Sequence, residues 1–386
     1  MNRKEINEIK GLFASIEECN ILRLAGCYVN ADKEKVLSFD EPFFDFPKEE
    51  KHKYLEIFRK SLSGQAGKNT LDMEFISDAN EDADLSLING RTLLEKMRKS
   101  ELKDMSFLDE FYNRIIDTYD FLGNYLILAI YQEYDVPGKA TDGTSMDDAS
   151  DEVYQYVLCS ICPLKLSKPG LGYDETKNSI HTLKQDYFVD APDVAFLYPA
   201  FTDRSADTDK LLFYTKNTGE LQAALIGGFL DCCVPMAANV QKASFTDIVT
   251  EVLDTESDIE TVKNIHDNLR DLAEEKKKEA NGEAAYVGKE EVKRVLEKSG
   301  VSEEKLESFD TKYKQRFTDE SGTEEKIVAT NIVPPRSKFE VKTPDVYVKV
   351  NSDKTDLVET RVIDGKKCLV IELGEGIVVN GIPINR

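Results

Sequence analysis

The hydrophobic pattern of the first 120 residues predicts helices and strands in alternation. Apolar positions at helical spacing and short alternating runs place six elements in this region. They are a helix, a β-hairpin, a second helix, a strand and two further helices: residues 2–15, 20–39, 47–64, 70–75, 87–99 and 107–119. Pro47 stands at the favoured first position of its helix, and Gly64 ends that helix.

The middle of the chain is rich in predicted strands and then returns to helices. β-Branched and aromatic runs bounded by Pro, Gly and Asp predict strands at 124–134, 153–166, 194–201 and 210–216. Helical patterns follow at 219–233, 243–253 and 258–276. The charged segment 274–285 predicts a linker, and residues 286–317 predict a pair of helices hinged at Ser299-Gly300.

The C-terminal residues, 338–386, predict a small antiparallel β unit that follows a second polar linker at 318–337. Asp364-Gly365 and Asn380-Gly381 are residue pairs of the kind that type I′ hairpin turns require. The fold class predicted from these elements is α+β. Residues 1–273 form the main region, a mixed, mostly antiparallel sheet with flanking helices.

The composition is that of an acidic globular protein of two or three domains. The chain has 386 residues, and 50 Lys and Arg against 73 Asp and Glu leave a net charge of −23. The acidic excess is spread along the chain, so the surface repels phosphate backbones and anionic lipid. Binding to a membrane surface or to nucleic acid without specificity is therefore disfavoured.

Nothing in the sequence predicts export or insertion into a membrane. Charged residues interrupt the N-terminal segment, so a signal peptide is not expected. The longest apolar stretch, Leu221 to Val240, contains Asp231 and Pro235, which favours a buried helix over a membrane span. Seven cysteines without an export signal predict reduced thiols and a cytoplasmic location.

Two pairs of cysteines have spacings that deserve a structural test. Cys159 and Cys162 have the spacing of a redox pair or half of a zinc site, but they lie in a strand-like run. Residues three apart on a strand point to opposite faces, so we expect both thiols to be free and to bind no zinc. Cys232 and Cys233 lie in an apolar helical stretch and are expected to be core residues.

The motifs of common enzymes are absent from the sequence. There is no dinucleotide-binding glycine fingerprint, no P-loop and no nucleophile elbow, so neither a cofactor nor a catalytic residue can be assigned. Residues 63–69 resemble a phosphate loop but follow a helix instead of preceding one. Arg59 and Lys68 beside them are candidates for an anion clamp, and a simple C-cap and turn is the competing interpretation.

Acidic residues cluster in two segments at strand ends, 134–152 and 190–209. If these segments meet, their carboxylates suit a Mg²⁺ or Mn²⁺ ion. The candidate metal ligands are five aspartates: Asp148, Asp151, Asp203, Asp207 and Asp209. Arg204 would either clamp an anionic substrate over the ion or neutralise the acidic cluster. The competing interpretation is solvated turns, in which Asp is a favoured residue.

Several stretches of the chain resemble DUF4317, a family of bacterial proteins defined as a domain of unknown function. The matching segments include EIFRKSLSGQAGKN at 56–69, DASDEVYQYVLCSICPLKLSKPGL at 148–171, and residues 123–143, 190–217 and 339–384. The resemblance implies a cytoplasmic bacterial protein. It implies no activity, substrate or catalytic residue.

Three functional hypotheses follow. The sequence favours a non-catalytic binding or regulatory protein that acts through protein–protein contacts, because catalytic motifs are absent and a small terminal module is joined by linkers. The alternative is a metal-dependent phosphoester or nucleotide hydrolase that uses the aspartate segments. The third is a nucleic-acid-associated protein using the helical pair 289–316, where eight basic residues are accompanied by seven acidic ones. The oligomeric state is left open.

Overall fold

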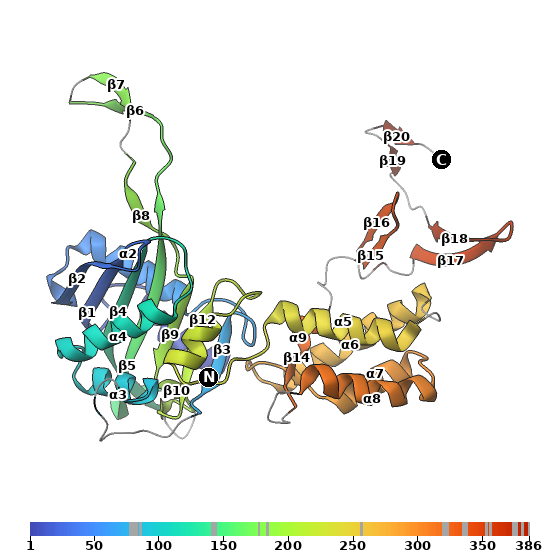
Figure 1. Ribbon diagram of the computed structural model, residues 1–386, viewed down its shortest axis with the longest axis horizontal. Coiled ribbons are helices and arrows are strands. Elements are labelled where there is room, and N and C mark those ends of the chain that lie inside the picture. The colour runs from blue at the N-terminus through green and yellow to red at the C-terminus, as the bar shows by residue number, and fades with distance from the viewer. Residues whose placement is uncertain are drawn as a thin grey trace. The chain divides into compact units, whose positions relative to one another are not determined.

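The computed structural model describes two compact units, residues 1–237 (unit 1) and 238–386 (unit 2) (Figure 1). The described part of the chain leaves out a set of short segments: residues 77–83, 85–86, 140–144, 177, 183–184, 255–257, 319–323, 334–338, 352–353, 355–356, 373–376, 380–381 and 385–386. The unit boundary falls at residue 237, before the helical patterns at 243–253 and 258–276, whereas the main region was predicted to extend to residue 273. The reason is that these helices bury their apolar faces within unit 2.

Unit 1 is built on one large antiparallel sheet. Its described strands run in the order β2-β1-β4-β5-β9-β12-β3, and β8 (Tyr187–Val189) pairs with β5 outside this path. Every one of these pairings is antiparallel. The strands of the main path are β1 Ile21–Val29, β2 Lys35–Pro42, β3 Thr70–Glu74, β4 Tyr125–Lys139, β5 Ser145–Leu166, β9 Val194–Tyr198 and β12 Lys210–Thr215. The predicted α+β fold with a mostly antiparallel sheet is confirmed.

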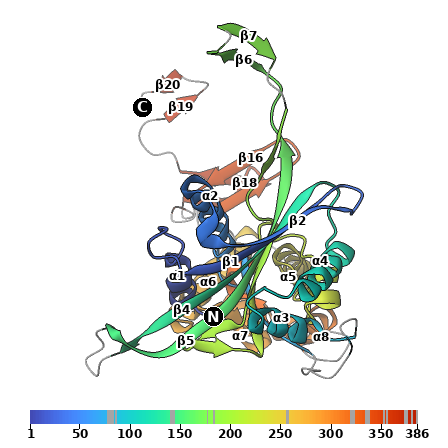
Figure 2. The same ribbon diagram turned by 90° about the vertical axis from the view of Figure 1, so that its left-hand side faces the viewer.

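Helices cover both faces of this sheet (Figure 2). One face carries α3 (Gly90–Lys99), α4 (Met105–Thr118) and the π-helix η2 (Ala224–Phe229). The other face carries α1 (Arg3–Gly11), the short η1 (Phe43–Asp45) and α2 (Lys48–Ser61). Strand alternation explains the two layers, because Ile127 and Tyr131 of β4 belong to the first cluster whereas Leu128 and Ile130 belong to the second.

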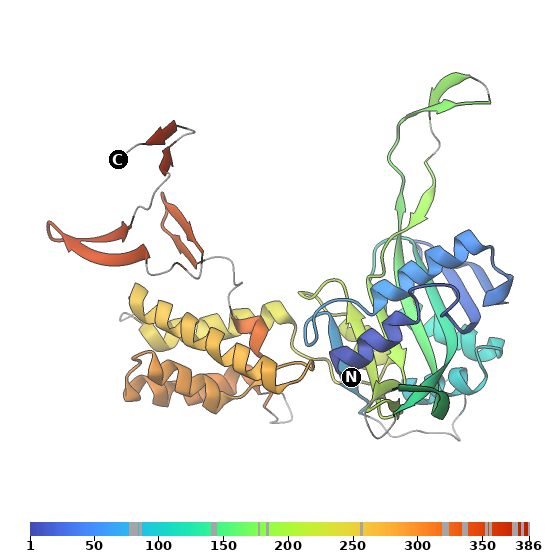
Figure 3. The same cartoon turned by 180° about the vertical axis from the view of Figure 1, so that it is seen from behind.

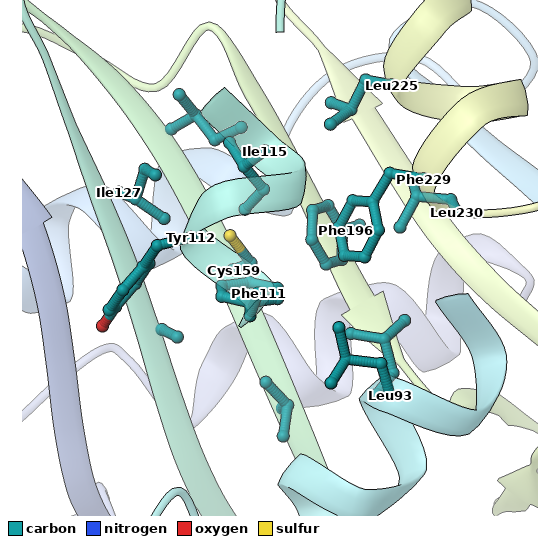
Figure 4. Packing of buried hydrophobic residues seen from close by; sticks show 14 of the residues in the cluster. Leu93, Phe111, Tyr112, Ile115, Ile127, Cys159, Phe196, Leu225, Phe229 and Leu230 are labelled. Atoms are coloured by element: carbon teal, nitrogen blue, oxygen red, sulfur yellow. The ribbon is translucent and has the colours of Figure 1, made fainter. Parts of the chain in front are cut away.

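Aromatic rings fill the core under α4 (Figure 4). The Phe111 centroid lies 6.2 Å from Phe196 of β9 and 5.7 Å from Phe229 of η2. Cys159 of β5 is buried in the same cluster. Ser160, one residue on, instead bonds Ser61 of α2 across the opposite face at 2.7 Å. Cys162 shares the parity of Ser160, so the two thiols point to opposite faces, and both are free cysteines.

The apolar stretch at 221–240 is not a regular helix. The π-helix η2 ends at Phe229, and the chain then runs irregularly until helix α5 (Ala238–Leu253) begins. Pro235 lacks the N–H that a continuing helix needs. Cys232 is buried, as expected, but Cys233 is exposed, which corrects the prediction that both are core residues. No helix in the described part of the chain is long and apolar enough to cross a membrane.

Unit 2 consists of helices followed by hairpins (Figure 3). Its helices are α5 Ala238–Leu253, α6 Ile259–Glu279, α7 Lys289–Lys298, α8 Glu303–Phe317 and α9 Ala329–Ile332. Two short strands, β13 Tyr286–Val287 and β14 Ile327–Val328, pair between them. The hinge predicted between α7 and α8 is present, and Gly300 adopts a left-handed φ of +92° there.

Both predicted linkers contain ordered structure. Helix α6 continues to Glu279, so the first six residues of the linker at 274–285 are helical, and Ala273 is buried. In the linker at 318–337, Ile327 and Ile332 are buried. The Gln241 amide of α5 accepts the Val328 N–H at 3.1 Å, which ties this segment to the helices. Charge density alone was an unreliable sign of a linker.

The C-terminal β unit is present as three separate hairpins. They are β15 Phe339–Lys342 with β16 Tyr347–Val350, β17 Val358–Ile363 with β18 Lys366–Ile371, and β19 Ile377–Val379 with β20 Ile382–Ile384. The turn predicted at Asp364-Gly365 is confirmed, with φ of +51° and +75° at its two central residues. The pair Asn380-Gly381 lies outside the described residues.

Candidate functional site

The candidate residues Asp203 and Arg204 form a tight turn. They connect β10 (Ala200–Thr202) to β11 (Ser205–Asp207), and Thr202 pairs directly with Ser205. Both have left-handed φ values, 52° and 63°, as the two central residues of a type I′ turn do. Their conformation is therefore set by the hairpin.

Helix α1 holds this turn through two glutamates. The Asp203 N–H donates to Glu5 Oε1 at 2.8 Å, and the Arg204 guanidinium is 2.8 Å from Glu8. Arg204 also donates to the Pro137 carbonyl at 2.9 Å, and the Tyr134 hydroxyl donates to Glu8 at 2.8 Å. These contacts are those of a counter-ion that fastens β10–β11 to α1 and β4.

The two acidic segments do approach one another, through the bond from Arg204 to the Pro137 carbonyl and at Glu152, a residue outside the candidate set. Glu152 of β5 accepts a hydrogen bond from the Ser205 hydroxyl at 3.0 Å. Asp207 accepts the Asp209 N–H at 3.1 Å, and Asp209 itself forms an ion pair with Arg91 of α3.

Three of the five candidate metal ligands, Asp203, Asp207 and Asp209, have described side chains. Asp148 and Asp151 lie in β5, but their side chains lie outside the described residues. Among the side chains that are described, no group of three or more His, Cys, Asp or Glu is arranged to hold a metal ion. The aspartate site therefore remains a prediction.

The other two clamp candidates lie near α2. Arg59 is exposed on this helix, and Lys68 lies in the turn that leads to β3. Lys10 of α1 joins this basic region, donating to the Ser63 hydroxyl at 2.9 Å. Partial burial, followed by the charges of Arg59 and Arg3, lowers the pKa of Lys10. No described contact joins Arg59 or Lys68 to Arg204.

Acidic partners engage many of the basic residues of the helical pair α7–α8. Lys293 is 2.5 Å from Asp310, and Arg316 pairs with Asp247 at 3.1 Å and also with Glu251. A nucleic acid would have to compete with these carboxylates for the same cations.

A long two-stranded arm projects from the sheet of unit 1 (Figures 1 and 2). We define the arm as residues 164–189, which begin where β5 passes Pro163, the last residue paired with β4. The arm contains the end of β5, β6 (Leu171–Asp174), β7 (Ser179–Thr182) and β8 (Tyr187–Val189). Its base is fixed by Asp190, which forms ion pairs with Lys165 at 2.7 Å and Lys216 at 3.4 Å. The hydrogen bond from Lys165 is the main reason that the pKa of Asp190 falls to about 2.

The arm presents exposed apolar side chains on defined faces. At the tip, Leu171 lies opposite Thr182 and Tyr173 lies opposite Ile180, so all four share one face. Leu171, Tyr173 and Ile180 are 76%, 58% and 64% exposed. Nearer the base, Leu166 lies opposite Tyr187 and Leu164 lies opposite Val189. Leu166 and Leu171 lie five positions apart, so strand alternation does not place these base residues on the face of the tip. We call the exposed apolar side chains of the tip face the apolar face of the arm: Leu171, Tyr173 and Ile180.

Hydrogen bonds give the arm a defined shape between these two hairpin segments. The Ser167 N–H donates to the Asp186 carbonyl at 2.9 Å, and the Ser167 hydroxyl accepts the Asp186 N–H at 3.0 Å. At the tip, the Tyr173 hydroxyl donates to Asn178 at 2.8 Å. The arm was missed in the sequence, although the alternation of Leu171 and Tyr173 before a turn at Asn178 is a period-two signal that could have located it.

Unit 2 contains a groove of about 860 Å³ between α5, α6 and the β15–β16 hairpin. Apolar residues such as Phe245, Val249 and Phe339 line it, and Lys242 and Lys342 are also among its lining residues. Burial lowers the pKa of His266 in its wall, which favours the neutral imidazole. The groove has the size and apolar lining of surfaces that bind other molecules.

These observations define a two-unit α+β protein with an antiparallel, helix-covered sheet, an exposed β arm and a helical unit followed by hairpins. The chain belongs to the DUF4317 family, since the model of that family, described as a domain of unknown function, matches residues 1–382. This confirms the resemblance found in the sequence. No curated protein and no solved structure matches the chain.

Proposed function

We propose that this protein is a non-catalytic binding protein of the cytoplasm that acts through protein–protein contacts made by the arm. The observation that carries the proposal is the apolar face, in which large side chains stay exposed along a projecting, hydrogen-bonded hairpin. Contiguous exposed apolar surface marks interaction sites, whereas single exposed apolar residues do not.

Burial of this face would supply binding free energy of a useful size. A fully buried Leu, Ile or aromatic side chain contributes about 1.5–3 kcal/mol. Leu171, Tyr173 and Ile180 are more than half exposed, so a partner that covered them would gain several kcal/mol before the costs of association. Tyr173 suits the centre of such an interface, because its ring offers apolar area and its hydroxyl is already bonded to Asn178.

The candidate clamp and metal-ligand residues give less support to the hydrolase alternative. Arg204 is held by Glu8 and the Pro137 carbonyl, and Asp209 is held by Arg91. A ligand anion or a metal ion would have to displace these partners. The proposal therefore treats the β10–β11 region as structural and the arm as the functional surface.

Photocrosslinking in the native cytoplasm tests the proposal. A benzoylphenylalanine replaces Tyr173 on the arm or, as a control, Leu122, which is 100% exposed on the body of unit 1. We expect the probe at position 173 to form a discrete crosslink to protein, identified by mass spectrometry, and the probe at position 122 to form none. A purified partner should then lose at least tenfold in affinity for the variant Tyr173→Ser/Ile180→Ser. Equal crosslinking at both positions, or none at position 173, would contradict the proposal.

A further inference from the structure

We infer that the groove of unit 2 binds a small organic anion with a long apolar chain, of the fatty-acid class, and that Lys242 and Lys342 receive its carboxylate. The groove lies between α5, α6 and the β15–β16 hairpin. The arm belongs to unit 1, so this inference goes beyond the proposed function and does not depend on it.

Apolar side chains from three elements line the groove. On α5 they are Phe245, Val249 and Leu253, which lie four positions apart and therefore form one stripe along the helix. Ile265 of α6 and Phe339 of β15 add to this lining. Phe245, Leu253 and Ile265 are buried, whereas Val249 and Phe339 are half-buried. A hydrocarbon chain in the groove would cover the apolar surface that these two residues still expose.

The volume and the hydrogen bonds of the groove suit such a ligand. Its volume of about 860 Å³ is within the range of roughly 300–1,000 Å³ for pockets that enclose small molecules. The two hydroxyl-bearing residues of the lining, Thr246 and Thr250, donate to the carbonyls of Lys242 and Thr246, each at 2.8 Å. A sugar or a nucleotide needs many hydrogen-bonding groups around it, whereas an apolar chain needs none.

The charge balance of the groove is opposite to that of the chain. Three lysines and two acidic residues line it, a balance of +1 with a neutral His266, in a chain of net charge −23. Both acidic residues are already engaged. Glu340 forms an ion pair with Lys349 at 3.0 Å, and Asp258 caps α6 by accepting the Thr261 N–H at 2.6 Å.

Lys242 and Lys342 are the two cations of the lining that are left for a ligand. Both are exposed, and neither has an ion pair within the described part of the chain. Burial is the main cause that lowers the pKa of His266 in the wall, and the charge of Lys242 adds to it, so this charge acts on the groove. An anionic group is the complement that the apolar, lysine-bearing lining lacks.

The ligand is expected to be a free molecule and not part of a membrane. A surface of net charge −23 is repelled by a bilayer of anionic lipid. A single fatty acid carries one carboxylate, which two lysines can balance locally. The inference therefore commits to a monomeric amphiphile.

Isothermal titration calorimetry of the full chain with sodium laurate, below its micelle concentration, tests the inference. We expect one laurate per chain. The affinity should rise about two- to fourfold per methylene from octanoate to laurate, because a fully buried methylene contributes about a factor of four. Dodecyltrimethylammonium, a cation with a similar chain, should bind at least tenfold more weakly than laurate, although the net charge of the protein favours the cation.

Reversal of the two lysine charges provides the sharpest comparison. Lys242→Glu/Lys342→Glu should weaken laurate binding at least tenfold and raise the affinity for the cation. Lys314→Glu/Lys366→Glu is the matched control, since it changes the net charge equally at two exposed lysines, on α8 and β18, that do not line the groove. It should leave both affinities within about twofold. If the groove variant loses its native circular dichroism, Lys242→Met replaces it, with an expected loss of at least threefold.

Four results would overturn the inference. They are no laurate binding at about 1 mM, a cation that binds as tightly as laurate, an equal loss of affinity in the two double variants, and binding to phosphatidylglycerol vesicles without binding to laurate. If laurate does not bind and a benzoylphenylalanine at Val249 crosslinks to a protein, the groove belongs to a protein partner instead. Crosslinking at Tyr173 is measured separately, so the proposed function can stand when this inference fails.

Discussion

Replacing Arg204 by methionine tests whether this residue is structural, and we expect the change to destabilise unit 1. The guanidinium fastens the β10–β11 turn to α1 through Glu8 and to β4 through the Pro137 carbonyl. Methionine keeps the length of the side chain and is not β-branched, so the left-handed backbone at this position gains no additional strain.

The magnitude follows from the exposure of the groups involved. The side chains of Arg204 and Glu8 are 27% and 23% exposed, so the ion pair is partly screened and contributes about 0.2–1 kcal/mol. Losing the bond to the Pro137 carbonyl costs a further ~1 kcal/mol. The total of about 1–2 kcal/mol corresponds to a fall of roughly 2–8 °C in the melting temperature of a unit of this size.

The assay needs a local readout, because two units need not unfold in one step. Thermal unfolding followed by circular dichroism gives the melting temperature. Hydrogen exchange measured by mass spectrometry should be faster in Arg204→Met than in the unchanged protein for α1 and β10–β11. For α4 the exchange rate should stay the same. Lys68→Met is the matched control, since it removes a cation from another clamp candidate that has no described ion pair, and it should leave both measurements unchanged.

The reasoning would be refuted by a loss of less than ~0.3 kcal/mol together with unchanged exchange in α1. That result would mean that the contacts of Arg204 with Glu8 and Pro137 do not hold the turn. The guanidinium would then be available to a ligand, and the anion-clamp interpretation of the sequence would regain support. Arg204→Lys adds a second criterion, because lysine keeps the charge but cannot make both contacts in the geometry of a guanidinium.

Three other measurements test the described structure. Gln132→Met should stabilise unit 1 by about 1 kcal/mol in denaturant unfolding, because the buried Gln132 amide has no described hydrogen-bond partner; a loss of stability would mean that internal water satisfies it. Native alkylation at pH 8 should modify the exposed Cys233 and spare Cys159, whose pKa burial raises; equal labelling of the two would contradict the core of unit 1. Millimolar Mn²⁺ should leave the melting temperature unchanged, whereas a rise that Asp207→Asn or Asp209→Asn abolishes would establish the metal site.

Local patterns predicted the sheet of unit 1 well because strand signals are short-range. β4 is a long apolar run bounded by turns, and its residues alternate between two buried faces as a helix-covered sheet requires. The Asp364-Gly365 turn was predictable for the same reason, since two adjacent residues with left-handed φ determine a hairpin. The opposite orientation of the Cys159 and Cys162 side chains was predictable for the same reason. Strand periodicity alone places residues three apart on opposite faces.

The errors arose where a decision depended on distant contacts. Residues 274–279 are highly charged, yet they extend α6, because a charged surface is compatible with a helix whose other face is buried. The segment at 318–337 has a polar start, but its apolar part is anchored by Gln241, about 90 positions earlier in the chain. No local window contains that information.

The candidate site shows a more general limit of sequence reasoning. Aspartates in loops drew attention because metal sites need carboxylates, but turns favour Asp as well, and Asp203 occupies such a turn.

The arm differs from the aspartate segments, because its residues drew no attention as candidate ligands. They form an ordinary amphipathic hairpin. A hydrophobic pattern reports that Tyr173 and Ile180 should be covered, but it cannot say whether the covering surface belongs to the same chain. In the described residues both side chains remain more than half exposed. The proposed binding partner therefore rests on this mismatch between pattern and burial more than on any motif.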